Sequence, residues 1–489
     1  VLVIALTATS VIAEAQVKGD PFEQYRQAID NRFEEIRQGN ERVFNNYRDK
    51  INDEFAHYLE REWDKLSISK VIPNPFKPEP APVVDNTPAE ASNPLPHVIP
   101  LQEDDEKPQP TPVEPIKPSE LPATEPRPES NVVTFSFFGS ECKIHIPTPK
   151  EYALKDASIE EVGKAWDILI DDKYNNMLLE CLEYRQSLAL CDWGMYQFLL
   201  AFSGSYCGNA ECNDAVMLQM FVLSQLGYRV RLAKQGDQLF NLIAFEQHVF
   251  SAPYLEIDGI AFYNLSTKAS KGEIQICNFA FPGEESASLK MRSLPILPDN
   301  PTAARTIRSQ SFSFASVIVS TNKNLIRFLD TYPGCSWELF AQASLSQATK
   351  DQIYPALKKA IYGQSEQRAA NILLNLVQTG FEYQTDDEQF GREKTFFGDE
   401  TFYYPYCDCE DRSVLFAILV KDLLGLDVVL LDYPSHIATA VHFNTETVGD
   451  YFDIDGIKYT ICDPTYIGAP IGKSMPDMAK LRVNILKVN

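Results

Sequence analysis

Cysteine is scarce in this 489-residue chain, and its 10 residues are too few for a disulfide scaffold of this size. Positive charge is also scarce, because 44 Lys and Arg face 68 Asp and Glu, for a formal charge of −24 at pH 7. This balance argues against a nucleic-acid-binding role. After the first residues no apolar run is long enough to span a membrane, so we do not expect an integral membrane protein. The sequence shows no metal-binding motif and no phosphate-binding glycine loop, and we expect no metal and no cofactor.

The first 130 residues divide into three segments of different composition. Residues 1–16 are apolar and end in small residues at Ala13 and Ala15, which predicts a signal peptide with a truncated start and a periplasmic or extracellular protein. The end of a membrane anchor is the alternative. In residues 17–70 apolar side chains recur every three or four positions, which predicts helices that pack on the rest of the protein or, as a coiled coil, bind a partner protein. Residues 71–130 hold 17 of the 32 prolines, which predicts an extended, disordered linker.

The stretch from residue 407 to residue 463 carries the residue types of nucleophilic catalysis. It begins Cys-Asp-Cys-Glu-Asp-Arg-Ser, and its second cysteine, Cys409, precedes an apolar run that Gly425 ends, so Cys409 is expected at the start of a helix. There the helix dipole would lower the pKa of its thiol. His436 follows a Pro-Ser turn and begins an alternating strand, and Asp463 ends a later strand before a proline. A thiolate, an imidazole base and an orienting carboxylate are the three groups that such catalysis needs.

These residues, in this order, resemble the transglutaminase-like superfamily, a papain-related group of Cys-His-Asp acyltransferases and peptidases. The resemblance covers residues 350–489. It rests on Cys-Glu-Asp opening a helix, Leu-Gly after it, His at a strand start and Asp-Pro-Thr at a later strand end. It implies Cys409 as nucleophile, His436 as general base and acid, and Asp463 as the carboxylate that orients the imidazole.

Each candidate also has a plainer interpretation. A cysteine beside apolar residues is usually inert, and only the ordered triad favours a nucleophile at Cys409. Cys407 and Cys462 have no role in the pattern and are expected to be buried or disulfide-bonded. His442 is expected on the same strand face as His436 but deeper in the strand, where it packs or is solvated. Asp411 is expected to be a first-turn or supporting group, because its charge would raise the pKa of the thiol.

An earlier stretch repeats the same order and spacing. Cys212 and Ser266 are 54 residues apart, and so are the later cysteine and aspartate. Gln238 follows a glycine by 11 residues, as His436 does, and Ile-Asp-Gly-Ile occurs in both stretches nine residues before the last position. This agreement predicts a tandem repeat.

The first copy departs from the pattern at its chemical positions. Gln238 stands where the histidine is expected and cannot act as a base at neutral pH. Ser266 is a poor substitute for an orienting carboxylate, so Cys212 lacks the groups that would activate it. His248 is a lesser alternative that could return to this site as a base. We therefore predict a catalytically dead copy that is kept for packing or for substrate binding.

The fold prediction is α+β, with tandem transglutaminase-like domains that each pack a helix on an antiparallel sheet. The degenerate domain is expected at residues 131–300 and the catalytic domain at residues 301–489. Within the second, residues 356–380 are expected to form one helix. In this family the segment before the cysteine helps to build the substrate groove and oxyanion hole, and here Gln378, Gln389 or one of several aromatic residues could do so.

The functional prediction is a secreted or periplasmic cysteine hydrolase that cleaves amide or peptide bonds through a thioester. Hydrolysis is the first choice because water is always available, whereas a lysine acceptor needs a dedicated site. A protein-glutamine acyltransferase and a non-catalytic binding scaffold are the alternatives. The substrate is expected to be a protein or peptide, and the sequence does not choose among a cell-wall peptide, a dietary protein and a partner protein.

Overall fold

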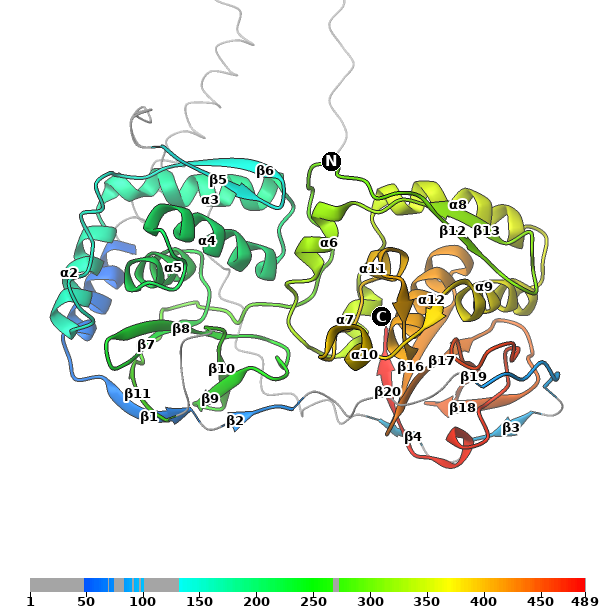
Figure 1. The fold of residues 1–489 in the computed structure, drawn as a ribbon. Helices are drawn as coiled ribbons and strands as arrows, with labels where there is room; N and C mark the ends of the chain where they lie inside the picture. The colour runs from blue at the N-terminus through cyan, green and yellow to red at the C-terminus, as the bar shows by residue number, and fades with distance from the viewer. Residues whose placement is uncertain are drawn as a thin grey trace, which may run out of the picture.

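The computed structural model describes residues 48–68, 70–73, 83–89, 92–95, 98–100, 132–266 and 272–488. The predicted signal peptide and the first part of the helical segment lie outside these residues. The described residues form an α+β protein with two lobes, each of which joins a seven-stranded sheet to a group of helices (Figure 1). One hydrophobic core runs through both lobes and includes Phe55, Trp166, Val222, Phe328 and Val414.

The first lobe follows the N-terminal segments and contains a hairpin, four α-helices and five strands. In chain order these are β5 (Val132–Phe137), β6 (Ser140–His145), α2 (Ile159–Leu169), α3 (Asn175–Ser187), α4 (Asp192–Cys207), α5 (Asn213–Gln225), β7 (Val230–Gln235), β8 (Gln238–Ala244), β9 (Pro253–Ile257), β10 (Ile260–Asn264) and β11 (Gly272–Cys277). Helix α5 is buried along nearly its whole length, which explains its almost continuous apolar sequence.

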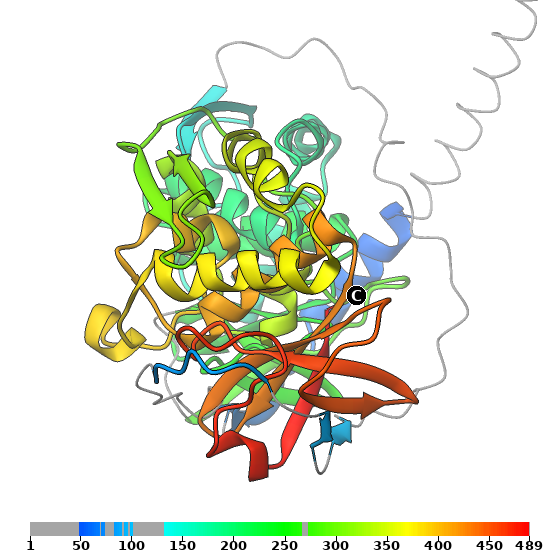
Figure 2. The same ribbon diagram turned by 90° about the vertical axis from the view of Figure 1, so that its right-hand side faces the viewer.

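The second lobe has more helices before its sheet begins. Its elements are β12 (Arg305–Arg308), β13 (Ser316–Val319), α6 (Lys323–Leu329), α7 (Trp337–Gln342), α8 (Gln347–Ile361), α9 (Glu366–Gly380), β14 (Glu382–Tyr383), α10 (Asp386–Phe390), α11 (Gly398–Tyr403), β15 (Tyr406–Cys407), α12 (Cys409–Leu424), β16 (Asp427–Tyr433), β17 (His436–His442), β18 (Asp450–Ile454), β19 (Ile457–Cys462) and β20 (Val483–Lys487). Figure 2 shows the helices stacked on one side of this sheet.

The predicted single helix over residues 356–380 is wrong, because the structure has two helices there. Helix α8 ends at Ile361, and Gly363 then adopts a φ of +71°, a left-handed conformation that glycine reaches without strain. Ser365 restarts the chain as α9 by accepting a hydrogen bond from the Arg368 N–H. Both helices show an apolar stripe, so periodicity alone did not reveal the break.

The two large sheets have the same internal strand order. The first runs β11-β7-β8-β10-β9 and the second runs β20-β16-β17-β19-β18, with every neighbouring pair antiparallel. Helices α5 and α12 pack on corresponding strands, α5 on β7 and β8 and α12 on β16 and β17. The positions that the sequence pairs lie at corresponding places to within one residue. Cys212 immediately precedes α5 and Cys409 is the first residue of α12, while Gln238 and His436 begin β8 and β17.

The described residues between 48 and 100, called here the N-terminal arm, form the outer strands of both sheets (Figure 1). After a helix at residues 48–59, strands β1 (Asp64–Ile68) and β2 (Lys70–Val71) pair with β11 and β9. Strands β3 (Asn93–Pro94) and β4 (Val98–Pro100) pair in parallel with β18 and β20. In these described parts the chain departs from the expected helix up to residue 70 and from a free linker, whereas residues 101–130 of the predicted linker lie outside the described residues. The open edges of the sheets offer unpaired backbone groups, and pairing with them outweighs local propensity.

Candidate active site

Cys409 is the first residue of α12 and contacts the start of β17. Its side chain is 0% exposed, and its sulfur accepts a hydrogen bond from the backbone N–H of Ile437. One helical turn later, the Ser413 hydroxyl donates to the Ile437 carbonyl at 3.1 Å. Residues four apart lie on one face of a helix, so α12 uses both polar backbone groups of Ile437. This contact fixes the thiol beside the residue that follows His436.

His436 and Asp463 form the second contact that the sequence predicts. The imidazole Nε2 hydrogen-bonds Asp463 Oδ2 at 2.8 Å, and both side chains are buried. The other carboxylate oxygen, Oδ1, accepts from the backbone N–H groups of Thr465 (2.9 Å) and Tyr466 (3.1 Å). The loop after β19 therefore sets the direction in which Asp463 faces the imidazole.

The Cys409 sulfur contacts Ile437, the residue after His436, but no hydrogen bond between the thiol and the imidazole is seen among the described residues. The Nδ1 atom of His436 is buried and has no hydrogen-bond partner among the residues that the structure describes. The Cys409 sulfur instead donates to Glu410 Oε2 at 3.2 Å. Catalytic hydrogen bonds are often open in a protein without substrate, so the free Nδ1 keeps His436 available as a base.

The structure contradicts the predicted low pKa of the Cys409 thiol. Burial raises the pKa of this thiol well above its usual value, and the charge of Asp408 raises it further. The hydrogen bond that the sulfur accepts from the Ile437 N–H lowers the pKa of the thiol but is outweighed. The helix dipole argument overlooked the removal of water, which disfavours the thiolate.

Three buried carboxyl groups, which the sequence analysis did not single out together, lie close to one another, and two of them flank Cys409 in the chain. Asp386 of α10, Asp408 and Glu410 each place one carboxylate oxygen within 4.8 Å of the others. Burial is the main cause that raises the pKa of Asp386 to about 9 and that of Asp408 to about 6. The Asp-Cys-Glu order was a signal for two of them, but the arrival of Asp386 depends on the tertiary fold.

Two other buried acids of this region, Asp411 and Glu400, have hydrogen-bond or ion-pair partners outside this group of three carboxyl groups. Asp411 accepts from the backbone N–H of Phe396 (2.8 Å) and of Asp408 (3.3 Å), as a first-turn helix residue. The Glu400 carboxylate pairs with the Lys394 ammonium at 2.7 Å. Asp386 also accepts a backbone N–H, that of Lys394, but no ion pair joins Asp386, Asp408 or Glu410 to a cation in the described part of the chain.

Gln378 holds the loop that follows Asp463. Its side-chain amide donates to the carbonyls of Asp463 (3.0 Å), Tyr466 (2.8 Å) and Ala469 (3.0 Å), and its oxygen accepts from the N–H of Gly468 (3.2 Å). Because its donors are all used, Gln378 is not free to stabilise an oxyanion, contrary to one of the sequence alternatives. The result is a fixed support behind the His436–Asp463 pair.

The N-terminal arm reaches the same loop from outside. The Asp85 N–H donates to the Ile467 carbonyl at 3.0 Å, and the Tyr466 hydroxyl donates to the Asp85 carboxylate at 2.8 Å. The hydrogen bonds from the backbone and hydroxyl of Thr87, together with that from Tyr466, hold the pKa of Asp85 well below its usual value. The arm therefore packs against the residues that position Asp463.

The remaining candidates lie away from the pair. His442 Nδ1 contacts the Lys458 carbonyl at 3.1 Å, and its ring packs on Tyr459. Cys407 and Cys462 are buried and unpaired, and all ten cysteines are free, so the disulfide alternative is wrong for both.

The first lobe presents different contacts at the matching positions. The Gln238 amide donates to the Glu211 carbonyl (3.0 Å) and to Asn213 Oδ1 (3.2 Å). The N–H of Leu239, which corresponds to Ile437, donates to Asn213 Oδ1 at 2.9 Å instead of to a cysteine. Ser266 contacts Glu211 at 3.5 Å, and no Gln238–Ser266 hydrogen bond is seen in the described residues. His248 contacts the Tyr263 hydroxyl at 3.3 Å and does not join this site.

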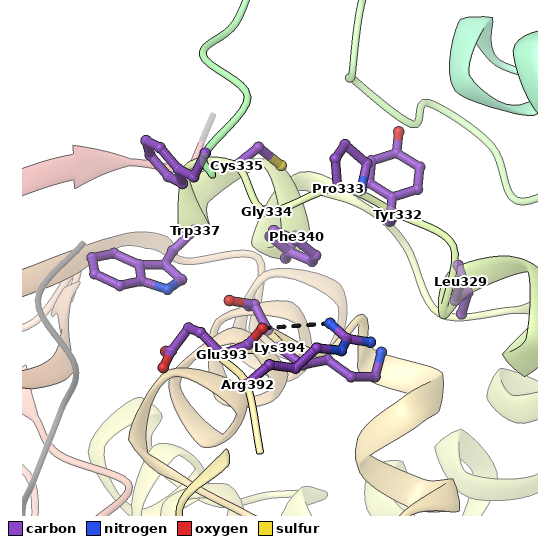
Figure 3. Close-up of a pocket in the computed structure, with 12 residues that line it drawn as sticks. Leu329, Tyr332, Pro333, Gly334, Cys335, Trp337, Phe340, Arg392, Glu393 and Lys394 are labelled. Carbon is purple, nitrogen blue, oxygen red and sulfur yellow. Dashed lines mark hydrogen bonds between the residues drawn. The ribbon is translucent and has the colours of Figure 1, made fainter. Parts of the chain in front are cut away.

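A small cleft lies where the two lobes meet. Figure 3 shows the aromatic side chains of Tyr332, Trp337 and Phe340 on one side and residues 392–394 on the other. Phe250 of the first lobe also lines it. The Lys394 N–H donates to Asp386 Oδ2 at 2.5 Å, so one wall of the cleft is joined to the carboxyl groups beside Cys409.

Within the described residues no helix is both long and apolar enough to cross a membrane. Comparison of the chain with known protein families, with curated proteins and with solved structures finds no match.

Proposed function

We propose that this protein is a cysteine hydrolase that cleaves amide or peptide bonds through a thioester on Cys409. The observation that supports this most is the His436–Asp463 hydrogen bond of 2.8 Å beside a helix-initiating cysteine, with the second imidazole nitrogen unpartnered among the described residues. A base must be held by a third group and still keep one nitrogen for the nucleophile. This arrangement supplies both.

In the proposed reaction the Cys409 thiol gives its proton to His436 Nδ1 and the sulfur forms a bond to the substrate carbonyl carbon. The tetrahedral intermediate collapses as the C–N bond breaks, and the imidazolium gives its proton to the leaving amine. Water then attacks the thioester with His436 as base, which releases the acid and restores the thiol. Asp463 keeps Nε2 protonated throughout and stabilises the imidazolium.

The Cys409 N–H is our proposed oxyanion donor. As the first residue of α12 its N–H has no partner within the helix, and it lies at the positive end of the helix dipole. A donor fixed before the reaction stabilises the charge that forms on the substrate oxygen.

The substrate class that we propose is a protein or peptide, and the proposed location is periplasmic or extracellular. The matching strand orders of the two sheets support the tandem transglutaminase-like arrangement. In this arrangement the first lobe is the inactive copy, because Gln238 occupies the place of the base and Ser266 the place of the orienting carboxylate. Acyl transfer to an amine would use the same thioester.

One observation favours a second candidate, a non-catalytic binding protein. The Cys409 thiol is 0% exposed and its pKa is raised, which is the environment of an inert cysteine. In this alternative the site residues serve only to hold α12 against the sheet.

Turnover of fluorogenic peptides, together with amine incorporation into casein, separates the two. We expect Cys409→Ala and His436→Ala to lower the rate by about 10²-fold or more, the usual effect of losing a base or nucleophile. The matched controls Cys212→Ala and His442→Ala should retain the rate. Unchanged rates in Cys409→Ala would refute the hydrolase, as would an equal loss in Cys212→Ala.

A further inference from the structure

A short stretch of the N-terminal arm, Asp85-Asn86-Thr87-Pro88, forms a turn that its own side chains hold. Oxygen Oδ1 of Asp85 accepts from the backbone N–H of Thr87 at 2.8 Å and from the Thr87 hydroxyl at 2.7 Å. Asp commonly forms such a bond to the backbone two residues later. Pro88 restricts Thr87 further, because a residue before proline favours an extended conformation. The turn therefore presents the second carboxylate oxygen, Oδ2, in a fixed direction.

The Oδ2 atom of Asp85 faces the loop that follows Asp463. It accepts a hydrogen bond from the Tyr466 hydroxyl at 2.8 Å, and the Lys473 ammonium lies 3.4 Å from it. Lys473 also donates to the Thr87 hydroxyl at 2.7 Å. The turn in the arm therefore joins two separate parts of this loop, one at Tyr466 and one at Lys473.

Backbone contacts hold the same two segments together. The Asp85 N–H donates to the Ile467 carbonyl at 3.0 Å, and Val84 and Ile467 form a parallel β-bridge. Gly468 lies against the arm so closely that a Cβ atom added to it would collide with Asn86 Oδ1. Glycine permits such an approach of two backbones. The contact between the arm and the loop is therefore specific to this one register.

Tyr466 connects this contact to the His436–Asp463 pair. Its side chain is buried, and its backbone N–H donates to Asp463 Oδ1 at 3.1 Å, while Asp463 Oδ2 bonds His436 Nε2 at 2.8 Å. Burial and the Asp85 carboxylate raise the pKa of the Tyr466 phenol to about 12, so its hydroxyl remains a donor at neutral pH. The same residue therefore contacts the arm through its side chain and the orienting carboxylate through its backbone.

We propose that Asp85 is a positioning residue for the His436–Asp463 pair and that it acts through Tyr466. This role rests on the proposed function, because it gives the N-terminal arm a part in that reaction. Gln378 fixes the carbonyls of the loop from inside the lobe, whereas Asp85 fixes the Tyr466 side chain from outside. Without the bond from Asp85, Tyr466 and its N–H can shift, and Asp463 turns relative to the imidazole. A displacement of about 1 Å can lower a rate by about 10²-fold.

Steady-state turnover of a fluorogenic peptide by the full chain tests this role. Tyr466→Phe removes only the hydroxyl, and Asp85→Asn removes the charge with little change in size. Because Gln378 still supports the loop, we expect each variant to lower kcat by about 10-fold, with KM unchanged since the contact positions the base and not the substrate. The double variant should be no slower than the slower single variant, because the two groups form one contact.

Lys70→Ala is the matched control for the arm. Lys70 Nζ bonds Glu256 Oε2 at 2.7 Å and so joins the arm to the first lobe, away from the loop that follows Asp463. This change should leave kcat as it is in the unmodified chain. An equal loss of kcat in Lys70→Ala would overturn the role of Asp85, and so would additive losses in the double variant.

Proton NMR of the same variants gives a readout that does not require turnover. The proton between His436 Nε2 and Asp463 is buried and should give a signal far downfield that is absent from His436→Ala. Tyr466→Phe and Asp85→Asn should shift or broaden this signal, whereas Lys70→Ala should leave it in place. A shifted signal in a chain that shows no turnover would overturn the hydrolase and support the positioning of Asp463. A lower melting temperature with kcat and the signal unchanged would overturn the positioning role.

Discussion

Replacing Gln378 tests whether one buried amide holds the loop that carries Asp463. The side chain is 2% exposed and makes four hydrogen bonds to the backbone of residues 463–469. Gln378→Ala removes all four, and each net hydrogen bond contributes about 0.5–1.5 kcal/mol. The expected loss in the free energy of unfolding is therefore about 3–5 kcal/mol, since the carbonyls left buried regain only part of their solvation.

Urea unfolding followed by fluorescence measures this loss, provided that the slope of the transition stays constant. Gln347→Ala is the matched control, because Gln347 is exposed and bonds only to Asp351 in the structure, and its change should stay within about 0.5 kcal/mol. Gln378→Glu should destabilise at least as much as Gln378→Ala, since a carboxylate oxygen would face three carbonyls. A loss below about 1 kcal/mol in Gln378→Ala would refute this reasoning. A lower turnover number at unchanged stability would return Gln378 to the role of oxyanion donor.

Three further predictions concern the N-terminal arm. Phe55→Ala should lower the free energy of unfolding by about 3–5 kcal/mol, because Phe55 is fully buried against Trp166. Leu66→Ala, at a partly exposed position of the arm, should lower it far less, and equal effects of the two changes in urea unfolding would show that the arm is not part of the core. Gly468→Ala should destabilise more than Gly456→Ala: both glycines have a φ of +80°, but only the first would press its new methyl group on the arm, so equal melting temperatures would contradict that contact. The lowered pKa of Asp85 means that its contribution is present above its unfolded pKa and is lost as the pH falls below about 4. The protection of residues 83–89 against hydrogen exchange, relative to the intrinsic exchange rate at each pH, should therefore fall in acid, and a chain with Asp85→Asn should lack this pH dependence.

Local signals carried most of the correct sequence predictions. The start of α12 at Cys409 follows from polar capping residues before an apolar run, and its end at Gly425 follows from a glycine with a φ of +66°. The β16–β17 hairpin, which places His436 opposite Tyr433, follows from a Pro-Ser turn between two β-branched runs. These features depend on neighbours within a few residues, which a sequence displays directly.

Features that depend on distant parts of the chain could not be predicted. Strands β3 and β4 have two and three residues and contain proline, and they exist only because the edges of a sheet more than 300 residues later accept them. The burial of Cys409, which reverses the expected direction of its pKa shift, likewise depends on packing of α12 against the sheet. The proximity of Asp386 to Asp408 also depends on the tertiary fold, because Asp386 lies on the short helix α10, whose sequence shows no clear apolar periodicity.

The two lobes together indicate which residues serve the fold and which serve chemistry. In the first lobe Asp214 accepts the N–H of Leu154 at 2.9 Å, just as Asp411 accepts that of Phe396, so this first-turn carboxylate belongs to the shared frame. Asn213, in contrast, stands where Glu410 stands and closes the same strand contact with a neutral amide. The helix and sheet of the first lobe therefore fold without an acid at this position. An unpaired buried charge would lower the free energy of unfolding by several kcal/mol. Since Glu410 is not needed to build this frame and its carboxyl group accepts the hydrogen bond of the Cys409 thiol at 3.2 Å, we assign it to the site and not to the fold.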